Sequence, residues 1–446
     1  MYSEQKNKML VAAIDIGTTF SACAYSLQID FETDSMHIHT NTWTSISRAL
    51  MSIKVPTAVL LDKSQKFLAF GYDAEEQYSE LVLDEEHHDY YYFCGFKMLR
   101  HELKHTVQTM IKDDNGIEMP ALEIFSLVIK NLKGHLLESF KSVETGIVND
   151  DIHWVLTVPA IWTESGKQFM REAANKAGIS GEHLSLCLKP DAATLLCQHL
   201  LTDKIQDEDV VGNACTSSEK GATFMVLDLG DETAEITCHQ KDADGTLLQL
   251  QTPSGGPWVG PSVDRAFNQL LIKIVGAPHL RKFQKENKFK AEELLIDFKM
   301  KSTKITNESI ERVTLRLPVS LLESFEKDTE EKIQDVLKQT AYEDKMTWCG
   351  DKLRMEANFF RALFNEAKSN LIEHVKSLLT KSHLKDVSTL LMVGSFSESL
   401  IMQSAVKDAY PGMTVFVPPE PGIAVLKGAV IYGHRIIARL PKKEIN

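Results

Sequence analysis

The stretch AIDIGTT at residues 13–19 is an apolar run that ends in an aspartate, a glycine turn and two threonines. A second stretch, VLDLGDET at residues 226–233, repeats this order in the other half of the chain. One Asp-x-Gly turn is typical of an ordinary hairpin, but its recurrence after a second apolar run favours a shared role. The repeat predicts two related α/β lobes.

The first turn has the chemistry of a phosphate-binding loop. Gly17 permits a tight turn whose backbone N–H groups can approach an anion, and Thr18 and Thr19 add hydroxyl donors. Asp15, at the end of the apolar run, can hold a hydrated magnesium ion that bridges phosphates. We therefore expect nucleotide phosphate at this turn.

Length and composition limit the class of protein. A chain of 446 residues exceeds what one hydrophobic core usually organises, and its 43% hydrophobic and 25% charged residues are near the globular average. Lys plus Arg number 49 and Asp plus Glu 62, a formal net charge of −13 that argues against a nucleic-acid partner. The seven scattered cysteines, without a C-x-x-C pair, favour a reduced cytoplasmic protein. No apolar run reaches about 18 residues, so we expect no membrane span.

The pattern along the chain predicts a layered α/β architecture. Strand-like runs at 10–16, 154–158, 223–229, 388–393 and 414–417 alternate with amphipathic helices over 121–140 and 356–380, whose apolar stripes should face the core. A polar, acidic segment at 203–221 is typical of a surface loop between lobes. We expect lobe I at 1–205, an inter-lobe loop at 206–221, lobe II at 222–435 and a tail at 436–446, too short for a peptide-binding domain.

Five segments in order resemble the actin-like ATPase superfamily, most closely the nucleotide-binding domain of the heat-shock 70 kDa proteins. They are AIDIGTTFSACAY (13–25), VLTVPAIWTESGKQFMREAANKAGI (155–179), LKPDAATLL (188–196), FMVLDLGDETAEIT (224–237) and LMVGSFSESLIMQSAVKDAYP (391–411). The forms GGPWVGPSVD (255–264), VGSFSES (393–399) and LKGAVIYG (426–433) resemble the atypical branch called heat shock 70 kDa protein 12.

The resemblance implies a two-lobed fold around a central cleft that binds ATP or ADP with magnesium. By position it places the phosphates on Gly17, Thr18, Thr19, Phe20, Gly230, Asp231, Glu232 and Thr233, and magnesium, through water, near Asp15 and Asp228. It places the adenosine near Lys299, Thr303, Gly394 and Ser395, and a phosphate-facing lysine near Lys97, although a surface lysine is the other interpretation of Lys97.

Two departures from the family bear on catalysis. Lys189 stands where the family has the glutamate that positions the attacking water, so hydrolysis should suffer. Asp191 is the candidate replacement, but in an extended segment it would lie about 6–7 Å further along, too far for a simple exchange. Asp231 and Glu232 replace paired glycines, and each carboxylate about 5 Å from phosphate would cost about 3 kcal/mol at an effective dielectric near 20.

Three hypotheses for the function stay open. The first is an atypical, chaperone-related or regulatory heat-shock protein that binds nucleotide and hydrolyses it slowly. The second is a pseudo-ATPase scaffold for protein partners, and the third is a small-molecule kinase on the same fold. The sequence is compatible with both an enzyme and a protein without activity, and it names no client.

Other metal-binding patterns are weak. HELKH at 101–105 matches H-E-x-x-H, but Lys104 and the lack of an evident third ligand favour a solvated helix face. The pairs His37 and His39, and His87 and His88, lack a Cys or carboxylate cluster at ligand spacing, which favours surface histidines.

Overall fold

A computed structural model describes residues 9–45, 50–96, 108–143, 145–204, 221–242 and 247–439. The candidate Lys97, the 101–105 motif and nearly all of the predicted inter-lobe loop lie outside these ranges. The chain forms two compact units. The first comprises Met1–Ala222, Thr237–Pro253 and Ile423–Asn446, and the second comprises Thr223–Ile236 and Ser254–Gly422. The predicted lobe boundaries stay a prediction.

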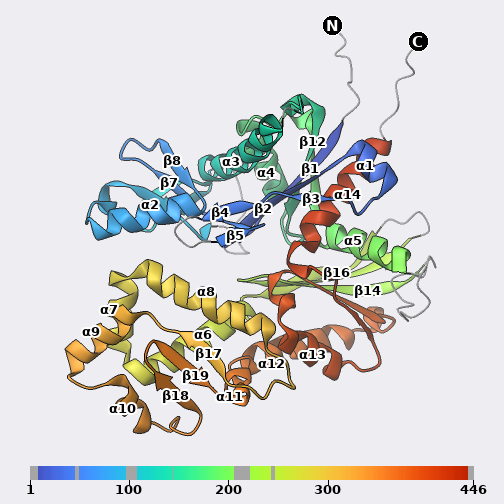
Figure 1. Ribbon diagram of the computed structural model, residues 1–446. Coiled ribbons are helices and arrows are strands. Elements are labelled where there is room, and N and C mark those ends of the chain that lie inside the picture. Colours follow the sequence, from blue (N-terminus) through green and yellow to red (C-terminus); the bar gives the residue numbers. More distant parts are fainter. Residues whose placement is uncertain are drawn as a thin grey trace, which may run out of the picture. The chain divides into compact units, whose positions relative to one another are not determined.

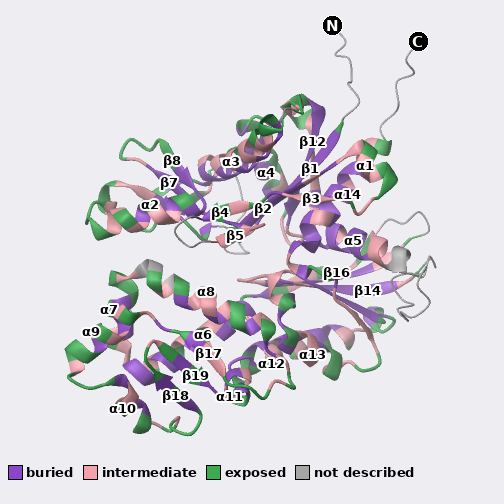
Figure 2. Ribbon diagram, in the orientation of Figure 1, coloured by how far each residue is buried: buried purple, intermediate pink, exposed green. Residues whose placement is uncertain are grey.

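The main sheet of the first unit has the order β13-β12-β1-β2-β3, and β6 also pairs with β2. These strands are β1 (Leu10–Ile16), β2 (Phe20–Leu27), β3 (His39–Thr40), β6 (Val55–Pro56), β12 (Ile152–Val158) and β13 (Leu184–Leu188). β1 runs antiparallel to β2 and parallel to β12, with Ile14 beside Leu156. Both β1 and β12 are buried along almost their whole length (Figure 2). The predicted strands at 10–16 and 154–158 are confirmed.

Helices cover this sheet. Its larger helices are α3 (Ala121–Ser142), α4 (Glu164–Lys176), α5 (Lys189–Lys204) and α14 (Ala424–Arg439). The helix predicted over 121–140 is confirmed as α3, whose apolar stripe is buried. α14, although it comes from the far end of the chain, packs on β1 and β12 and lies beside α5 (Figure 1). It also extends through Arg439, four residues into the expected tail.

Two glycines let α14 pack so closely. A Cβ atom on Gly428 would lie 1.8 Å from the carbonyl oxygen of Ala192 in α5. A Cβ atom on Gly433 would lie 2.4 Å from Cγ1 of Val11 in β1. Such separations are far inside van der Waals contact, so larger side chains would push α14 away from both neighbours.

Smaller elements complete the first unit. They are α1 (Gln28–Thr33), β4 (Trp43–Ser45), β5 (Leu50–Ser52), β7 (Val59–Leu61), β8 (Phe67–Phe70), α2 (Tyr72–Leu83), η1 (His87–Asp89), β9 (Tyr91–Phe93), β10 (Met110–Lys112), β11 (Glu118–Pro120), η3 (Asn149–Asp151) and η4 (Gly181–His183). β8, β7 and β9 form a small antiparallel sheet, while β4 with β5 and β10 with β11 form two-stranded ribbons.

The sheet in the second half of the chain has the order β16-β15-β14-β20-β21. Its strands are β14 (Thr223–Leu229), β15 (Ala234–Lys241), β16 (Leu247–Gly256), β20 (Thr389–Val393) and β21 (Thr414–Phe416). β14 is parallel to β20, which is parallel to β21. In this sheet, three strands that follow one another in the sequence lie beside two later, parallel strands. The first sheet has the same arrangement in its order β3-β2-β1-β12-β13. The three predicted strands of this half are confirmed, and the topology repeats as the two Asp-x-Gly stretches predict.

Helices and a small antiparallel sheet form the rest of the second unit, which ends at Gly422 within η7. They are α6 (Gly260–Val275), α7 (Ala277–Glu286), α8 (Lys288–Lys304), β17 (Val313–Arg316), α9 (Val319–Thr329), α10 (Ile333–Lys338), β18 (Met346–Cys349), β19 (Lys352–Met355), α11 (Ala357–Ala362), α12 (Asn365–Leu379), η5 (Ser382–Leu384), η6 (Ser395–Glu398), α13 (Leu400–Ala409) and η7 (Pro421–Ile423). In the described ranges, no helix combines the length and the apolar character needed to cross a bilayer.

The prediction of a single helix over 356–380 is wrong in one respect. The segment forms two helices, α11 and α12, which are separated at Leu363 and Phe364. The N–H groups of these two residues donate to the carbonyls three positions back, at Phe360 and Arg361, which tightens the chain into a turn. The apolar stripe is still buried on both sides of this turn, as predicted.

Candidate functional site

The first Asp-x-Gly turn joins β1 to β2. A Cβ atom on Gly17 would lie 2.0 Å from the carbonyl oxygen of Phe20, so the turn closes only around glycine. Thr57, just after β6, anchors the turn from the side: its hydroxyl donates to the Gly17 carbonyl at 3.0 Å and its N–H to the Thr19 carbonyl at 2.8 Å. The loop is therefore held in shape by the protein itself.

Asp15, which precedes this turn, has a cationic partner. Its Oδ1 atom lies 2.9 Å from Nζ of Lys189 and also accepts a hydrogen bond from the Thr157 hydroxyl. The parallel register of β1 and β12 brings Thr157 beside Asp15, and α5 begins at Lys189 directly after β13. The Asp15 side chain is 23% exposed and that of Lys189 15%. This ion pair is therefore half-buried and also hydrogen-bonded.

The pairing bears on the magnesium ion that the resemblance implies near Asp15. A divalent ion about 4 Å from the Lys189 ammonium would be repelled by about 8 kcal/mol at an effective dielectric near 20. The same Asp15 oxygen already accepts from two donors. With Lys189 in this position, the residues of the first turn do not fit a hydrated magnesium ion.

The prediction of an extended segment around Asp191 is wrong, because α5 begins at Lys189. Two residues along a helix turn the side chain by about 200°, so Asp191 and Lys189 leave the helix on nearly opposite sides. Burial raises the pKa of the Asp191 carboxyl from 3.8 to about 6, and Lys167 of α4 partly offsets this rise. Asp191 is thus a carboxyl that titrates near neutral pH, but it does not point in the direction of Lys189.

The second Asp-x-Gly turn joins β14 to β15. The Gly230 N–H donates to the Thr233 carbonyl at 2.9 Å and encloses Asp231 and Glu232. A Cβ atom on Gly260, the first residue of α6, would lie 2.0 Å from the Asp231 carbonyl oxygen. The two acidic residues are therefore part of a turn that packs directly on the start of a helix.

The segment expected near adenosine packs on the end of β14. Gly394 has a φ of +88°, and a Cβ atom there would lie 2.4 Å from the Leu229 carbonyl oxygen and 2.6 Å from Oδ1 of Asp228. Its N–H donates to the Pro421 carbonyl at 2.8 Å, and η6 begins at Ser395. Asp228, Gly394 and Ser395, distant in the sequence, are thus neighbours within the second unit.

Lys299 and Thr303 lie one turn apart on α8. Nζ of Lys299 is 3.2 Å from Oδ2 of Asp264 in α6, and the Thr303 hydroxyl donates to the Met300 carbonyl of its own helix. Burial raises the pKa of the Asp264 carboxyl, and Lys299 partly offsets the rise. Both candidate side chains therefore have a partner within the second unit.

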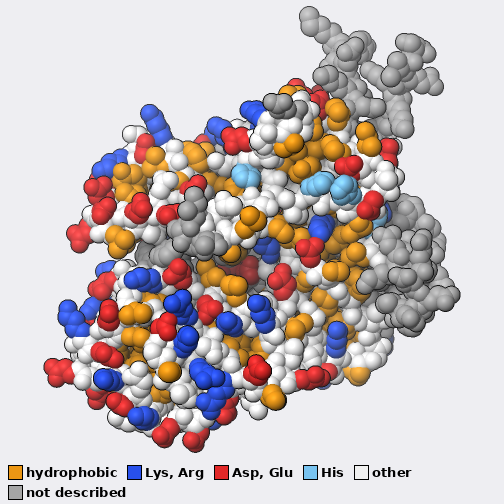
Figure 3. Space-filling model, in the orientation of Figure 1, with side chains coloured by type: hydrophobic (Ala, Val, Ile, Leu, Met, Phe, Trp, Pro, Cys, Tyr) orange, Lys and Arg blue, Asp and Glu red, His pale blue; other side chains and the backbone are white. Residues whose placement is uncertain are grey.

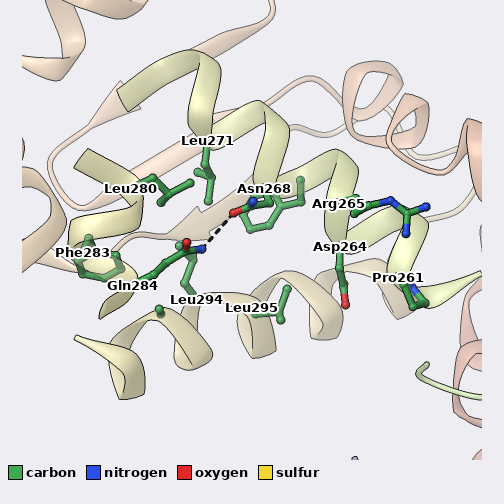
Figure 4. Close-up of a pocket in the computed structure, with 12 residues that line it drawn as sticks. Pro261, Asp264, Arg265, Asn268, Leu271, Leu280, Phe283, Gln284, Leu294 and Leu295 are labelled. Atoms are coloured by element: carbon green, nitrogen blue, oxygen red, sulfur yellow. Dashed lines mark hydrogen bonds between the residues drawn. The ribbon is translucent and has the colours of Figure 1, made fainter. Parts of the chain in front are cut away.

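Asp264 also lines a partly open cavity of about 360 Å³ between α6, α7 and α8. Its lining is mainly apolar, and Asn268 and Gln284 bridge it with a hydrogen bond of 3.0 Å (Figure 4). The apolar part is formed by Pro261, Phe267, Leu271, Leu280, Phe283, Ala291, Leu294 and Leu295.

Thr57 and Thr157 are site residues that sequence reasoning missed. Thr157 lies within the quoted 155–179 segment, but only the register of β12 against β1 shows that its hydroxyl meets Asp15. Thr57 follows a two-residue strand that has no periodic signal. Neither contact leaves a pattern in the local sequence.

Comparisons with known proteins identify the family. No family model matches the chain. The chain is 31% identical to heat shock 70 kDa protein 12B of Homo sapiens over 481 residues, covering 97% of this chain and 69% of that protein. It is 30% identical to heat shock 70 kDa protein 12A of Mus musculus over 478 residues, covering 97% of this chain and 70% of that protein. With two sheets of the same strand order, each carrying an Asp-x-Gly turn, the chain belongs to the heat shock 70 kDa protein 12 branch of the heat-shock 70 kDa family and has its two-lobed, actin-like ATPase fold.

Proposed function

We propose that this chain is a nucleotide-binding protein, for ATP or ADP, that hydrolyses ATP very slowly. Membership of the heat-shock 70 kDa family supports nucleotide as the ligand. The preformed turn around Gly17, with Thr18 and Thr19 in it, supports phosphate as the part of the ligand that this turn takes. We further propose a chaperone-related or regulatory role in the cytoplasm, in which the bound nucleotide matters more than its turnover.

The single observation that carries the slow hydrolysis is the ion pair of Lys189 with Asp15. The resemblance puts the water-positioning glutamate at 189, and a protonated amine cannot accept a proton from water. Loss of such a base commonly lowers a rate by about 10²–10⁴-fold. Asp15 also engages Lys189, so this carboxylate does not replace the missing base.

The test is calorimetric titration with ATP and with ADP, followed by a single-turnover assay on the ATP complex. We expect saturable binding of both nucleotides and hydrolysis at least about a hundredfold below that of an ordinary heat-shock 70 kDa ATPase. Brisk release of phosphate in a single turnover would show that another group does the work assigned to the glutamate.

A pseudo-ATPase scaffold is the second candidate, and the second turn is the observation that favours it. Asp231 and Glu232 add two carboxylates to a turn whose backbone is fixed against α6 at Gly260. Because this packing holds the turn in place, the two carboxylates would stay close to a phosphate group bound at the turn. Undetectable binding of both nucleotides in the same titration would make the scaffold the leading interpretation.

A further inference from the structure

We propose that the Lys189 ammonium is a built-in counter-cation of the first turn, so that the chain binds nucleotide without a divalent metal. This inference rests on the proposed nucleotide binding. It starts from the contact of Nζ of Lys189 with Oδ1 of Asp15 at 2.9 Å, an oxygen that also accepts from Thr157. The cation is thus seated on the carboxylate to which the resemblance assigns the hydrated metal.

The charge balance of the turn follows from this pair. A carboxylate at Asp15 together with a glutamate at 189 would carry a charge of about −2, which would repel phosphate unless a divalent ion intervened. Here the aspartate and the lysine sum to zero. A phosphate group can therefore approach the turn without a metal. A divalent metal ion at Asp15 would have to displace the Lys189 ammonium or be repelled by it.

The rest of the turn does not require a ligand to take its shape. Thr57 holds the carbonyls of Gly17 and Thr19 with two hydrogen bonds, and Ser21 holds the Thr57 hydroxyl at 2.8 Å. Lys189 itself is placed by α5, which α14 contacts closely at Gly428. The backbone that carries Lys189 is therefore held by packing, and its ammonium is held by the ion pair with Asp15.

The experiment is calorimetric titration of the full chain with ADP, once in excess magnesium and once in EDTA. We expect dissociation constants within about threefold of each other, since a threefold ratio is under 1 kcal/mol of binding free energy. Binding in magnesium but not in EDTA overturns the inference and leaves the proposed nucleotide binding intact. No binding in either buffer overturns both.

Variants of Lys189 test the role of the charge. Lys189→Gln should lower the affinity in EDTA by about tenfold or more and make it magnesium-dependent, whereas Lys189→Arg should keep binding in EDTA. Lys176→Gln is the matched control, because Lys176 pairs with Glu123 elsewhere in the first unit and its loss changes the net charge equally. Equal loss of affinity in Lys176→Gln and Lys189→Gln would show that only net charge matters, against the inference. The magnesium comparison on the unmodified protein stands even if a variant fails to fold.

A separate cluster carries a second inference, which does not depend on nucleotide. Asp30 of α1, His37 just before β3 and His39 of β3 each offer one ligand atom, and these atoms all lie within 4.8 Å of one another. The sequence shows no carboxylate at ligand spacing from the two histidines, but the fold brings Asp30 beside them. Figure 3 shows histidine side chains grouped at the surface over α1 and β3. We infer that these three residues bind a zinc ion.

The chemistry of the cluster suits zinc. Two imidazoles and one carboxylate are a common three-residue zinc set, with a fourth position open to water. Ligand atoms around tetrahedral zinc are about 3.3 Å apart, so small side-chain rotations would close the cluster. The Tyr25 ring stacks on His39 with 5.1 Å between ring centroids and limits how far His39 can turn, and Nδ1 of His37 is already 3.8 Å from Oδ2 of Asp30.

Competition titration of the reduced full chain with zinc against a chromophoric zinc indicator tests this site. We expect the unmodified chain to bind one more zinc ion than the double variant His37→Ala with His39→Ala. His87→Ala with His88→Ala is the matched control, because that pair also has adjacent rings, 4.0 Å apart. Identical zinc stoichiometry in the unmodified chain and the His37, His39 variant would remove the site.

Discussion

Burial raises the pKa of the Asp191 carboxyl from 3.8 to about 6. In the unfolded chain this proton is lost near 3.8, so the unfolded state loses its proton first as the pH rises. The free energy of unfolding therefore falls between pH 4 and pH 6 and stays lower above that window. Asp191→Asn removes this cost. It should stabilise the protein by about 1–3 kcal/mol at pH 7.5, with a gain that shrinks toward pH 4.

Urea unfolding of the Asp191→Asn variant and the unmodified chain at several pH values measures this difference. Glu182→Gln, at an exposed position on the other side of β13, serves as the control and should give no comparable gain. A gain that is the same at pH 4.5 and pH 7.5 would mean that Asp191 is not charged at a cost in the folded protein.

Lys189 has a second measurable consequence at the scale of the residue, for stability. Lys189→Glu would place two carboxylates together in a half-buried position, and we expect it to lower the free energy of unfolding by about 2–4 kcal/mol. Magnesium should recover part of this loss, because a divalent ion then fits between the carboxylates. Thermal unfolding with and without magnesium measures the effect. In the double variant with Asp15→Asn, most of the magnesium effect should vanish; if it persists, the metal binds elsewhere.

At the scale of the element, α14 makes a close contact with α5 at Gly428. Gly428→Ala would place a methyl group where the Ala192 carbonyl now lies, and we expect a loss of about 1–3 kcal/mol from overpacking. Gly134→Ala, in the middle of α3, meets nothing within 4 Å and should instead stabilise the protein by up to about 1 kcal/mol. Urea unfolding of both helix glycine variants measures the contrast. Equal effects would mean that α14 and α5 do not pack this closely.

The elements that the sequence predicts correctly are those with a strong local pattern. α3 and the five strands have clear periodicity or uninterrupted apolar character, which local residues determine. The break between α11 and α12 escapes prediction because the apolar residues keep a helical spacing across it. Leu363 comes three residues after Phe360, and both side chains are buried. The start of α5 is different, since Pro190 as its second residue is a known signal for a helix start, and the motif resemblance outweighed that signal.

The site was less predictable than the elements. Sequence resemblance points to Asp15, Gly17 and the acidic second turn, because these residues lie in contiguous motifs. The partners of these residues, Thr57, Thr157 and the ammonium of Lys189, come from three other segments. The strand order β13-β12-β1 and the helix after β13 bring Thr157 and Lys189 to the turn, and the pairing of β6 with β2 brings Thr57 there.

At the scale of the whole molecule, the two sheets repeat one topology but carry opposite modifications. The first turn gains a cation through Lys189, and the second gains two anions at Asp231 and Glu232. We expect Asp231→Gly with Glu232→Gly to raise nucleotide affinity by about tenfold or more, because two repulsive charges are removed. Adding Lys189→Glu in excess magnesium should then raise single-turnover hydrolysis above either change alone. Rapid-quench assays on the three variants decide this, and unchanged affinity in the glycine pair would show that the second turn does not face phosphate.

The close packing of α14 on β1 has a consequence for how the chain is made. Synthesis proceeds from the N-terminus, so β1 and β12 leave the ribosome long before α14, whose last residue is Arg439. At about 5–20 residues per second, the face of the first sheet that α14 covers waits on the order of tens of seconds for its last helix. During that interval Val11 and Val155, which contact Gly433 in the finished protein, are uncovered. Until α14 is made, the nascent chain therefore exposes an apolar sheet face, and exposed apolar surface is what chaperones recognise.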